Sequence, residues 1–355
     1  MNAVDQRWFE QRGFGEVLSA GLTACAASSG SAFIAAAVCL IPLALAQLVT
    51  AYLLGDLGVT EMQKQIQAGE LSPEQIDIRA MLLAQLYQLT TGVVAVVSAF
   101  FAATALARVI AERAVGKGGG AMSAWDFLMG GLFRILGASV VQGIVAAVGL
   151  VVCMLPGIAA LVGVMAVTGG MQPGQQPTAV AYVAMGIVGG IPFTIVLTYI
   201  TLMPMVTGAE QRGVSGTLRR AVGLISGSFV RAWGIVLVAS AASGGTIGLA
   251  GWVSQKHLMG SMQSSLGDAW GMAVAAVPQI ALMLLLAPFA YGIYTALYFD
   301  LRSRRTDEHF GPQELAYDLD YEIPGAVPEA PTADQDTDGP AAPPPSAPPG
   351  SDSRL

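Results

Sequence analysis

Six long apolar runs are the feature that most constrains how this chain folds. A helix needs about 20 consecutive apolar residues to cross the hydrocarbon core of a membrane. Runs of at least that length predict membrane spans at 32–54, 83–109, 138–167, 178–206, 230–252 and 272–299. Only 12% of the residues are charged, against roughly 25% in soluble domains. We therefore expect an all-α, polytopic transmembrane helical bundle and not a water-soluble fold.

The spans divide the chain into three parts. Residues 1–31 form an amphipathic N-terminal segment, residues 32–305 the transmembrane helical domain, and residues 306–355 a Pro/Ala-rich acidic tail. The tail holds eleven acidic residues and one basic residue, so it cannot bury a core and is expected to be disordered. Within it, a short acidic helix after Pro312 is expected, interpreted as a solvated spacer in preference to a docking peptide.

The basic residues predict the orientation. Thirteen of them lie before span one, in the loops that follow spans two and four or at the span ends beside those loops, or after span six: Arg7, Arg12, Arg108, Arg113, Lys117, Arg134, Arg212, Arg219, Arg220, Arg231, Arg302, Arg304 and Arg305. The opposite side holds only Lys64, Arg79 and Lys256. The positive-inside rule then places both termini in the cytoplasm.

Three segments on the basic side resemble one another and indicate an internal repeat. In each, an amphipathic stretch leads into a span, and the stretches align at Leu18, Leu128 and Leu218, followed four residues later by Leu22, Leu132 and Val222. Residues four apart share one face of a helix. We predict a threefold repeat of an interfacial helix followed by a transmembrane hairpin; three ordinary interfacial linkers are the alternative.

The third and fourth runs each contain an interior proline, Pro156 and Pro192. Proline removes a backbone donor, so helix kinks are expected at both. The alternative is a re-entrant pair over 156–190, tolerated if it is buried in protein. Span two is expected to start early, with Ser72 as its N-cap, followed by Pro73 and Glu74.

Chemistry-bearing residues are sparse in the spans. The span interiors hold only neutral polar side chains, namely Gln47, Gln85, Gln88, Gln142, Thr194, Thr198 and Gln279. His257 and His309 lie outside the spans, and the three cysteines are far apart, so no catalytic pair, metal site or cofactor site is predicted. No basic cluster indicates nucleic-acid binding. GxxxG spacings at Gly186/Gly190 and Gly244/Gly248 suit close helix packing, within the monomer or in a homo-oligomer.

Two segments carry a recognisable set of residues. These are Pro204, Glu210, Leu218, Arg219, Arg220, Gly227, Arg231 and Gly234 in 191–238, and Tyr298, Asp300, Leu301, Arg302 and Arg304 in 297–315. With them the chain resembles the bacterial glycerophosphoryl diester phosphodiesterase membrane-domain family. The resemblance implies a multi-pass protein of the bacterial inner membrane. The histidines and metal carboxylates of the catalytic barrel that follows this domain in some relatives are absent here, so no activity is implied.

A physical interpretation of the same residues is that 210–231 lies along the cytoplasmic interface. Arg219 and Arg220 would meet anionic head groups at ~1 kcal/mol each, and Val222, Leu224 and Ile225 would dip into the acyl boundary.

The leading functional hypothesis is a non-catalytic membrane protein that organises or scaffolds membrane lipids or protein partners. The alternative is a channel or transporter for a neutral or lipid-like solute. A lipid-acting enzyme would need a nucleophile that the sequence does not show.

Overall fold

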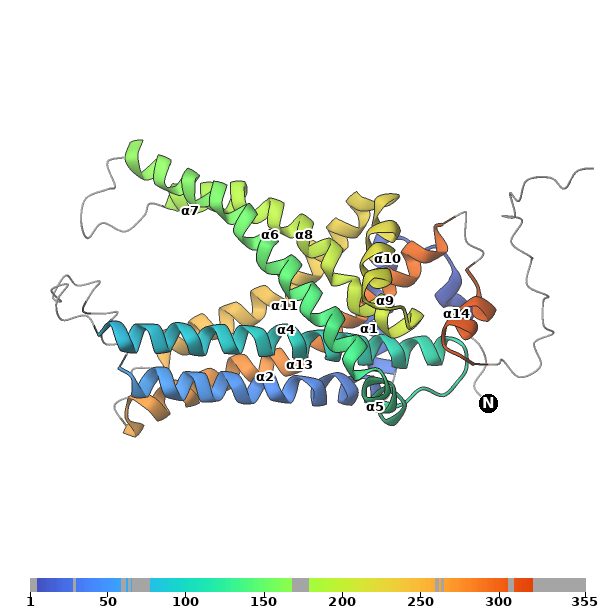
Figure 1. Cartoon of the computed structure of the whole chain (residues 1–355), viewed down its shortest axis with the longest axis horizontal. Coiled ribbons are helices and arrows are strands. Elements are labelled where there is room, and N and C mark those ends of the chain that lie inside the picture. The colour runs from blue at the N-terminus through green and yellow to red at the C-terminus, as the bar shows by residue number, and fades with distance from the viewer. Residues whose placement is uncertain are drawn as a thin grey trace, which may run out of the picture. The chain divides into compact units, whose positions relative to one another are not determined.

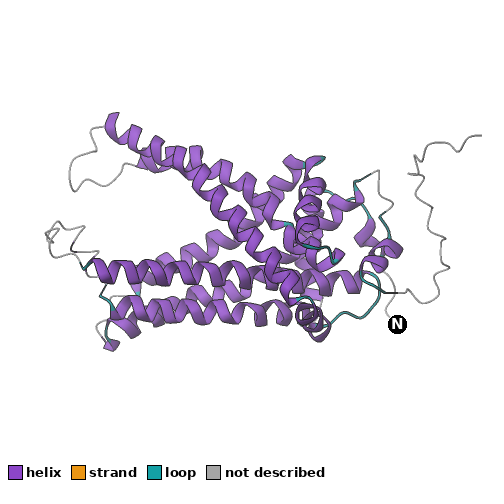
Figure 2. Ribbon diagram, in the orientation of Figure 1, coloured by secondary structure: helices purple, strands orange, loops and turns teal. Residues whose placement is uncertain are grey.

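The computed structural model describes residues 5–27, 30–58, 62, 65, 77–167, 179–258, 262, 265–305 and 310–321. The described residues form helices and no strand (Figure 2). The helices are η1 (Gln6–Phe9), α1 (Phe14–Ala27), α2 (Ser31–Asp56), α4 (Ile78–Ala114), α5 (Ala121–Gly130), α6 (Leu132–Val167), α7 (Ala179–Met185), η3 (Gly186–Gly190), α8 (Ile191–Thr201), α9 (Met203–Glu210), α10 (Val214–Ser226), α11 (Phe229–His257), α13 (Asp268–Ser303) and α14 (Pro312–Asp318).

Six helical stretches are long and apolar enough to cross a membrane, which confirms the predicted all-α bundle. They are Ser31–Asp56, Ile78–Ala114, Leu132–Val167, Val183–Glu210, Phe229–Ser254 and Asp268–Ser303. Each predicted span lies within or close to one of them. Several helices run past the predicted ends because their backbone hydrogen bonds continue into polar sequence, where hydropathy gives no signal. The chain is therefore a multi-pass α-helical membrane protein.

The order of the helices fits the predicted threefold repeat. Each of the short helices α1, α5 and α10 precedes a pair of long helices (Figure 1). The first leucines of the alignment, Leu18, Leu128 and Leu218, are buried or packed against the core. The residues four positions later, Leu22 in α1, Leu132 at the start of α6 and Val222 in α10, are exposed. In each repeat the first aligned residue therefore contacts the core and the second is exposed.

The first and third hairpins pack closely, because α2, α4 and α13 all contact one another and run side by side (Figure 1). Glycine allows two of the tightest contacts in the described residues. A Cβ at Gly21 of α1 would lie 2.4 Å from Cα of Ile293 in α13, and one at Gly208 of α9 would lie 2.6 Å from the carbonyl oxygen of Thr104 in α4. Backbones approach this closely only where side chains are missing.

The second hairpin is covered much less by protein. In the most apolar window of α6 only 6% of residues are buried, against 61% in α4. Figure 1 shows α6, α7 and α8 diverging from α4 toward the α7 end. The two arms meet at glycines, since a Cβ at Gly157 would lie 3.1 Å from Cα of Gly189. The outer half of this hairpin therefore packs mainly against itself.

The two interior prolines have different settings. Pro156 lies inside α6, which is continuous to Val167, so the re-entrant alternative for 156–190 is not what the described residues form. Pro192 occupies the first turn of α8, which directly follows the π-helical segment Gly186–Gly190. The π-helical register supplies the irregularity that a proline requires in the preceding turn. The Gly-rich turn between the arms lies outside the described residues.

Other expectations differ from the structure or fall outside it. The described part of α4 begins at Ile78, where Asp77 caps the helix by accepting from the amide of Ala80, while Ser72 to Glu74 lie outside the described residues. Most of the tail also lies outside the described residues. The GxxxG glycines Gly186, Gly190, Gly244 and Gly248 face open space, so they do not pack helices within the monomer.

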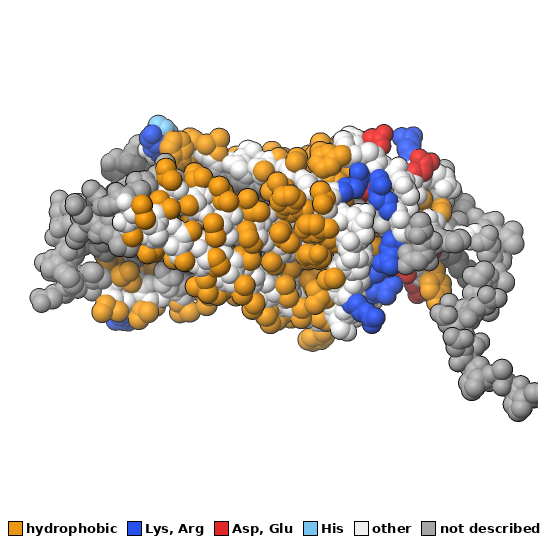
Figure 3. Space-filling model, turned by 90° about the horizontal axis from the view of Figure 1, so that it is seen from above, with side chains coloured by type: hydrophobic (Ala, Val, Ile, Leu, Met, Phe, Trp, Pro, Cys, Tyr) orange, Lys and Arg blue, Asp and Glu red, His pale blue; other side chains and the backbone are white. Residues whose placement is uncertain are grey.

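The surface separates by chemistry along the helix axes. Figure 3 shows a broad band of apolar side chains and, beyond one edge of it, a belt of Lys and Arg side chains. Hydrogen bonds confirm that basic residues distant in sequence share this end: Arg113 contacts Ser31, Arg134 contacts Gln211, and Arg231 contacts Asp300. We call it the basic end.

Candidate functional site

The buried charges of the basic end form three clusters. The first is the Glu210 cluster, made of Glu210, Arg212, Arg220, Tyr298, Arg302, Glu314 and Asp318. Glu210 is the last residue of α9, and the chain turns there because Gln211 takes a left-handed conformation with φ of 51°. The turn directs α10 back across α9, which brings Arg220 onto Glu210.

Glu210 is the centre of this cluster and its side chain is fully buried. It accepts hydrogen bonds from Arg220 Nε at 3.0 Å and from the Tyr298 hydroxyl at 2.8 Å. Arg212 Nε lies 2.5 Å from Oε2 of Glu210, and Arg302 Nη1 lies 3.6 Å from its Oε1. A buried carboxylate is tolerated when opposite charges and donors surround it in this way.

Arg302 connects Glu210 to the last described helix. Its side chain is 1% exposed, and its Nη2 lies 2.9 Å from Glu314 and 2.7 Å from Asp318, both on α14. The ring of Phe310 lies 4.4 Å from its guanidinium carbon. Burial, with the neighbouring carboxylates, raises the pKa of Asp318 despite the adjacent arginine. The predicted helix after Pro312 is confirmed, but the interpretation as a solvated spacer is wrong for 312–318 because this segment docks on Arg302.

The second group is the Asp300 cluster, made of Asp300, Arg12, Arg231 and Arg304. The carboxylate of Asp300 accepts from Arg231 Nε at 2.9 Å and from Arg304 Nε at 3.0 Å. It also accepts from the backbone amide of Arg12 at 2.8 Å. Both arginines donate in turn to the carbonyl oxygen of Arg12. The N-terminal segment is thereby fixed to α11 and α13.

The third group was not identified from the sequence. In it Glu112 pairs with Arg108 Nε at 2.9 Å and Lys117 Nζ at 3.6 Å, and accepts from the Ser123 hydroxyl at 2.6 Å. The available signal was the i,i+4 spacing of Arg108 and Glu112 at the end of an apolar run. The carboxylate fixes the loop between α4 and α5 because both Lys117 and Ser123 follow α4.

The structure brings together seven of the residues singled out by the resemblance. Glu210, Arg220, Tyr298 and Arg302 meet in one cluster, and Arg231, Asp300 and Arg304 in the other. The rest are dispersed: Pro204 and Leu301 are buried, Leu218 is half-buried, Arg219 is exposed, Gly227 ends α10, and Gly234 packs against the ring of Phe14.

The predicted interfacial role of the segment after Glu210 is partly wrong. Arg220 is 12% exposed and pairs with Glu210, so it does not reach head groups. Leu224 and Ile225 are buried in the protein core and not in the acyl boundary. Of the five residues named for this role, Arg219 and Val222 remain exposed. Arg220 pairs with Glu210 in preference to lipid because contact with a head group would leave the buried carboxylate of Glu210 with one partner fewer.

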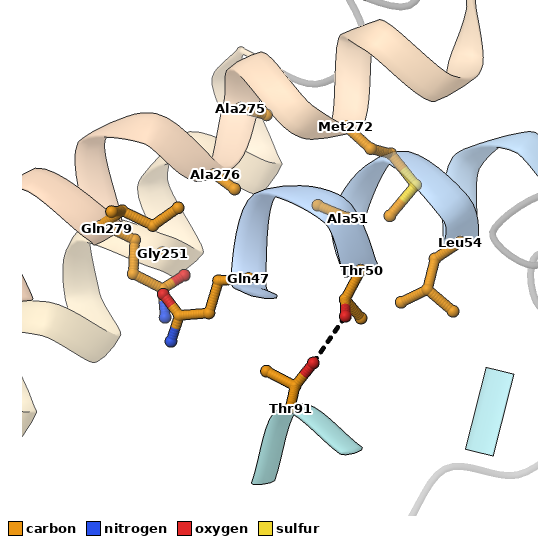
Figure 4. Close-up of a pocket in the computed structure, with 11 residues that line it drawn as sticks. Gln47, Thr50, Ala51, Leu54, Thr91, Gly251, Met272, Ala275, Ala276 and Gln279 are labelled. Atoms are coloured by element: carbon orange, nitrogen blue, oxygen red, sulfur yellow. Dashed lines mark hydrogen bonds between the residues drawn. The ribbon is translucent and has the colours of Figure 1, made fainter. Parts of the chain in front are cut away.

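A second candidate site is a cavity of about 250 Å³ between α2, α4, α11 and α13 (Figure 4). Its polar side chains are Gln47 and Thr50 of α2, Thr91 of α4 and Gln279 of α13. The hydroxyls of Thr50 and Thr91 are hydrogen-bonded at 2.6 Å. Figure 4 shows the amide groups of Gln47 and Gln279 ending at the same edge of the cavity, beside Gly251. Such a lining offers donors and acceptors without charge.

No group of three His, Cys, Asp or Glu among the described residues is placed to hold a metal ion. His257 lies exposed at the end of α11, and His309 is outside the described residues. The buried carboxylates Glu112, Glu210 and Asp300 are each paired with arginine or lysine, so they connect elements of the fold.

The helical fold and the three buried charge clusters define a multi-pass helical membrane protein with an ion-paired basic end. Comparison with models of known families, with curated proteins and with solved structures gives no match for this chain. The resemblance to the glycerophosphoryl diester phosphodiesterase membrane-domain family therefore stays a prediction.

Proposed function

We propose that this protein is a non-catalytic scaffold that organises lipids or protein partners in the bacterial inner membrane. The observation that carries the proposal is the outer part of the second hairpin, α6 to α8: only 6% of residues are buried in the most apolar window of α6 and 17% in that of Val183–Glu210. Helices in a membrane associate through side-chain packing. A hairpin that packs mainly against itself offers a lateral surface for a lipid, a second copy or another membrane protein.

The basic end supports the same proposal. Its Glu210 and Asp300 clusters hold α9, α10, α13, α14 and the N-terminal segment together through buried ion pairs. Breaking a buried pair costs about 3–5 kcal/mol, so this end is a rigid base. By the positive-inside rule it faces the cytoplasm with both termini. Tags on the two ends that report opposite compartments would refute this orientation.

Site-specific photo-crosslinking in cells tests the scaffold. A photoactivatable residue at Val151 of α6, 58% exposed, is compared with one at Leu45 of α2, 57% exposed. The two positions match in exposure and differ in the hairpin that carries them. We expect a discrete adduct, to a second copy, another membrane protein or a defined lipid, from Val151 and not from Leu45. Identical, diffuse lipid labelling at both positions would refute the proposal.

The alternative is a channel or transporter for a neutral solute, favoured by the cavity in Figure 4. Its neutral amides and hydroxyls suit a solute that needs hydrogen bonds without a counter-charge. If this is correct, solute flux in reconstituted vesicles should be lost on Gln279→Leu, which removes a polar wall, and on Pro192→Ala, which alters the π-helical junction. An absence of flux across a broad panel of neutral solutes would end it.

The family resemblance is supported by the meeting of its motif residues, which come from segments about 90 positions apart in sequence. It implies a shared architecture and no activity. Turnover of a phosphodiester by the purified protein would contradict the non-catalytic assignment.

A further inference from the structure

A pocket at the basic end has the composition of an anion site. It has a volume of about 370 Å³ and lies between the N-terminal segment, α1 and the end of α4. Its polar lining is Asp5, Arg7, Arg12, Ser19, Thr23 and Arg113, and its apolar lining is Trp8, Ala20, Ala24 and Ile110. We call it the arginine pocket. Three arginines face a single acid there.

The guanidinium groups of two of these arginines donate to no carboxylate among the described residues. Arg113 donates from Nε to the carbonyl of Gly119 at 2.9 Å and from Nη2 to the hydroxyl of Ser31 at 2.6 Å, both neutral acceptors. The guanidinium of Arg12 lies 4.6 Å over the ring of Trp8 and donates from Nη2 to the carbonyl of Arg7. Its Nη1 is shielded from solvent and has no hydrogen-bond partner.

The position of Arg12 is electrostatically unfavourable without an anion. Burial lowers the pKa of Arg12, and this outweighs the opposing effect of Asp300, Asp5, Glu10 and Glu16. The carboxylate of Asp300 is already bound by Arg231 and Arg304. Asp5 provides little relief, because it lies 3.8 Å from the exposed Arg7, and exposed pairs contribute little. Buried charges in proteins are normally paired. Because Nη1 of Arg12 has no hydrogen-bond partner, the pocket leaves a donor for an anion.

We propose that the arginine pocket binds the phosphate of an anionic phospholipid in the membrane leaflet at the basic end. Arginine forks match the geometry of phosphate oxygens, and the hydroxyls of Ser19 and Thr23 add polar groups to the same wall. The shared chemistry would also fit free phosphate.

Two features favour a lipid over free phosphate. The pocket wall continues into apolar side chains, Ala20, Ala24 and Ile110. It is built partly on α1, an apolar helix whose Phe14 and Leu22 are exposed. Acyl chains can lie along such a surface, whereas a free ion gains nothing from it.

This inference deepens the proposed function by naming its lipid partner, and it rests on that proposal. The two tests remain separate, because the crosslinking positions lie on α2 and α6, outside the arginine pocket. If the arginine pocket does not bind the lipid, the crosslinking result at Val151 is unaffected. If crosslinking at Val151 fails, lipid binding by the arginine pocket is likewise unaffected.

Native mass spectrometry of the full chain in detergent tests the inference. The protein is titrated with phosphatidylglycerol, with phosphatidylcholine of the same acyl chains, or with inorganic phosphate. The variants are Arg12→Gln and Arg7→Gln, and the matched control is Arg79→Gln, which removes an exposed arginine at the opposite end of α4, outside the pocket. Arg7 is 89% exposed, so its variant keeps the test valid if Arg12→Gln fails to fold.

We expect one phosphatidylglycerol to bind in preference to phosphatidylcholine. Arg12→Gln should weaken binding roughly tenfold, which corresponds to about 1.4 kcal/mol. Arg7→Gln should weaken it about fivefold, the effect of one arginine near an anionic surface, and Arg79→Gln should leave it unchanged. Equal binding of both lipids, or wild-type binding by both pocket variants, would overturn the inference. Inorganic phosphate that displaces the lipid would overturn its assignment to a phospholipid.

Discussion

Replacing the buried carboxylate of Glu210 should destabilise the basic end more than any neutral substitution on the surface. Glu210→Gln keeps the shape of the side chain and removes its charge. Arg220 at 3.0 Å and Arg302 at 3.6 Å would then face a neutral amide. The Tyr298 hydroxyl, at 2.8 Å, would lose an ionic acceptor.

The structure sets the size of the effect. Removing one partner of a buried ion pair costs about 3–5 kcal/mol because the other charge stays buried. Arg302 keeps Glu314 and Asp318, and Arg212 is 45% exposed and loses little. The expected cost is therefore at the lower end, about 3 kcal/mol in the free energy of unfolding.

Reversible unfolding in mixed SDS and detergent micelles, followed by far-UV circular dichroism, measures this change. Glu10→Gln is the matched control, because Glu10 is exposed and should change stability by less than about 0.5 kcal/mol. The double variant Glu210→Gln with Arg220→Gln should cost less than the sum of the single variants, since their effects couple. A cost for Glu210→Gln below about 1 kcal/mol would refute a structural role for the cluster.

Three further predictions follow from other contacts. Gly21→Ala should destabilise the protein by about 1–3 kcal/mol in the same assay, because its Cβ would meet the α13 backbone at 2.4 Å. The control Gly15→Ala, with open space around it, should be neutral or stabilising. Equal effects of the two substitutions would refute the close packing of α1. In a variant with Cys39→Ser and Cys153→Ser, the remaining thiol of Cys25 should resist maleimide at pH 8 until the protein is denatured. Burial raises the pKa of Cys25 to about 12 and so lowers its thiolate fraction. Rapid labelling of the folded protein would contradict the burial of Cys25. Asp300→Asn should speed hydrogen exchange of amides in 5–13, because Asp300 binds the amide of Arg12 and the two arginines that hold its carbonyl; unchanged exchange would show that the segment is held elsewhere.

The motif residues were found from the sequence, but their partners were not. Glu210 and Tyr298 were singled out separately, and nothing in their spacing indicates a hydrogen bond across 88 positions. Arg219 and Arg220 are neighbours with the same side-chain chemistry, yet one is exposed and the other is paired inside. Which of them turns inward depends on the direction of α10 after the turn at Gln211, a tertiary property.

By itself the sequence determined the helical membrane class, the six spans and the short helices before each hairpin. These depend on local length and hydropathy, because every backbone polar group in a bilayer must be satisfied within its own helix. The tertiary structure alone decided which charges pair, which glycines meet a backbone and which hairpin stays uncovered. Those outcomes depend on how helices distant in sequence approach one another, and apolar side chains that suit lipid suit a protein neighbour equally well.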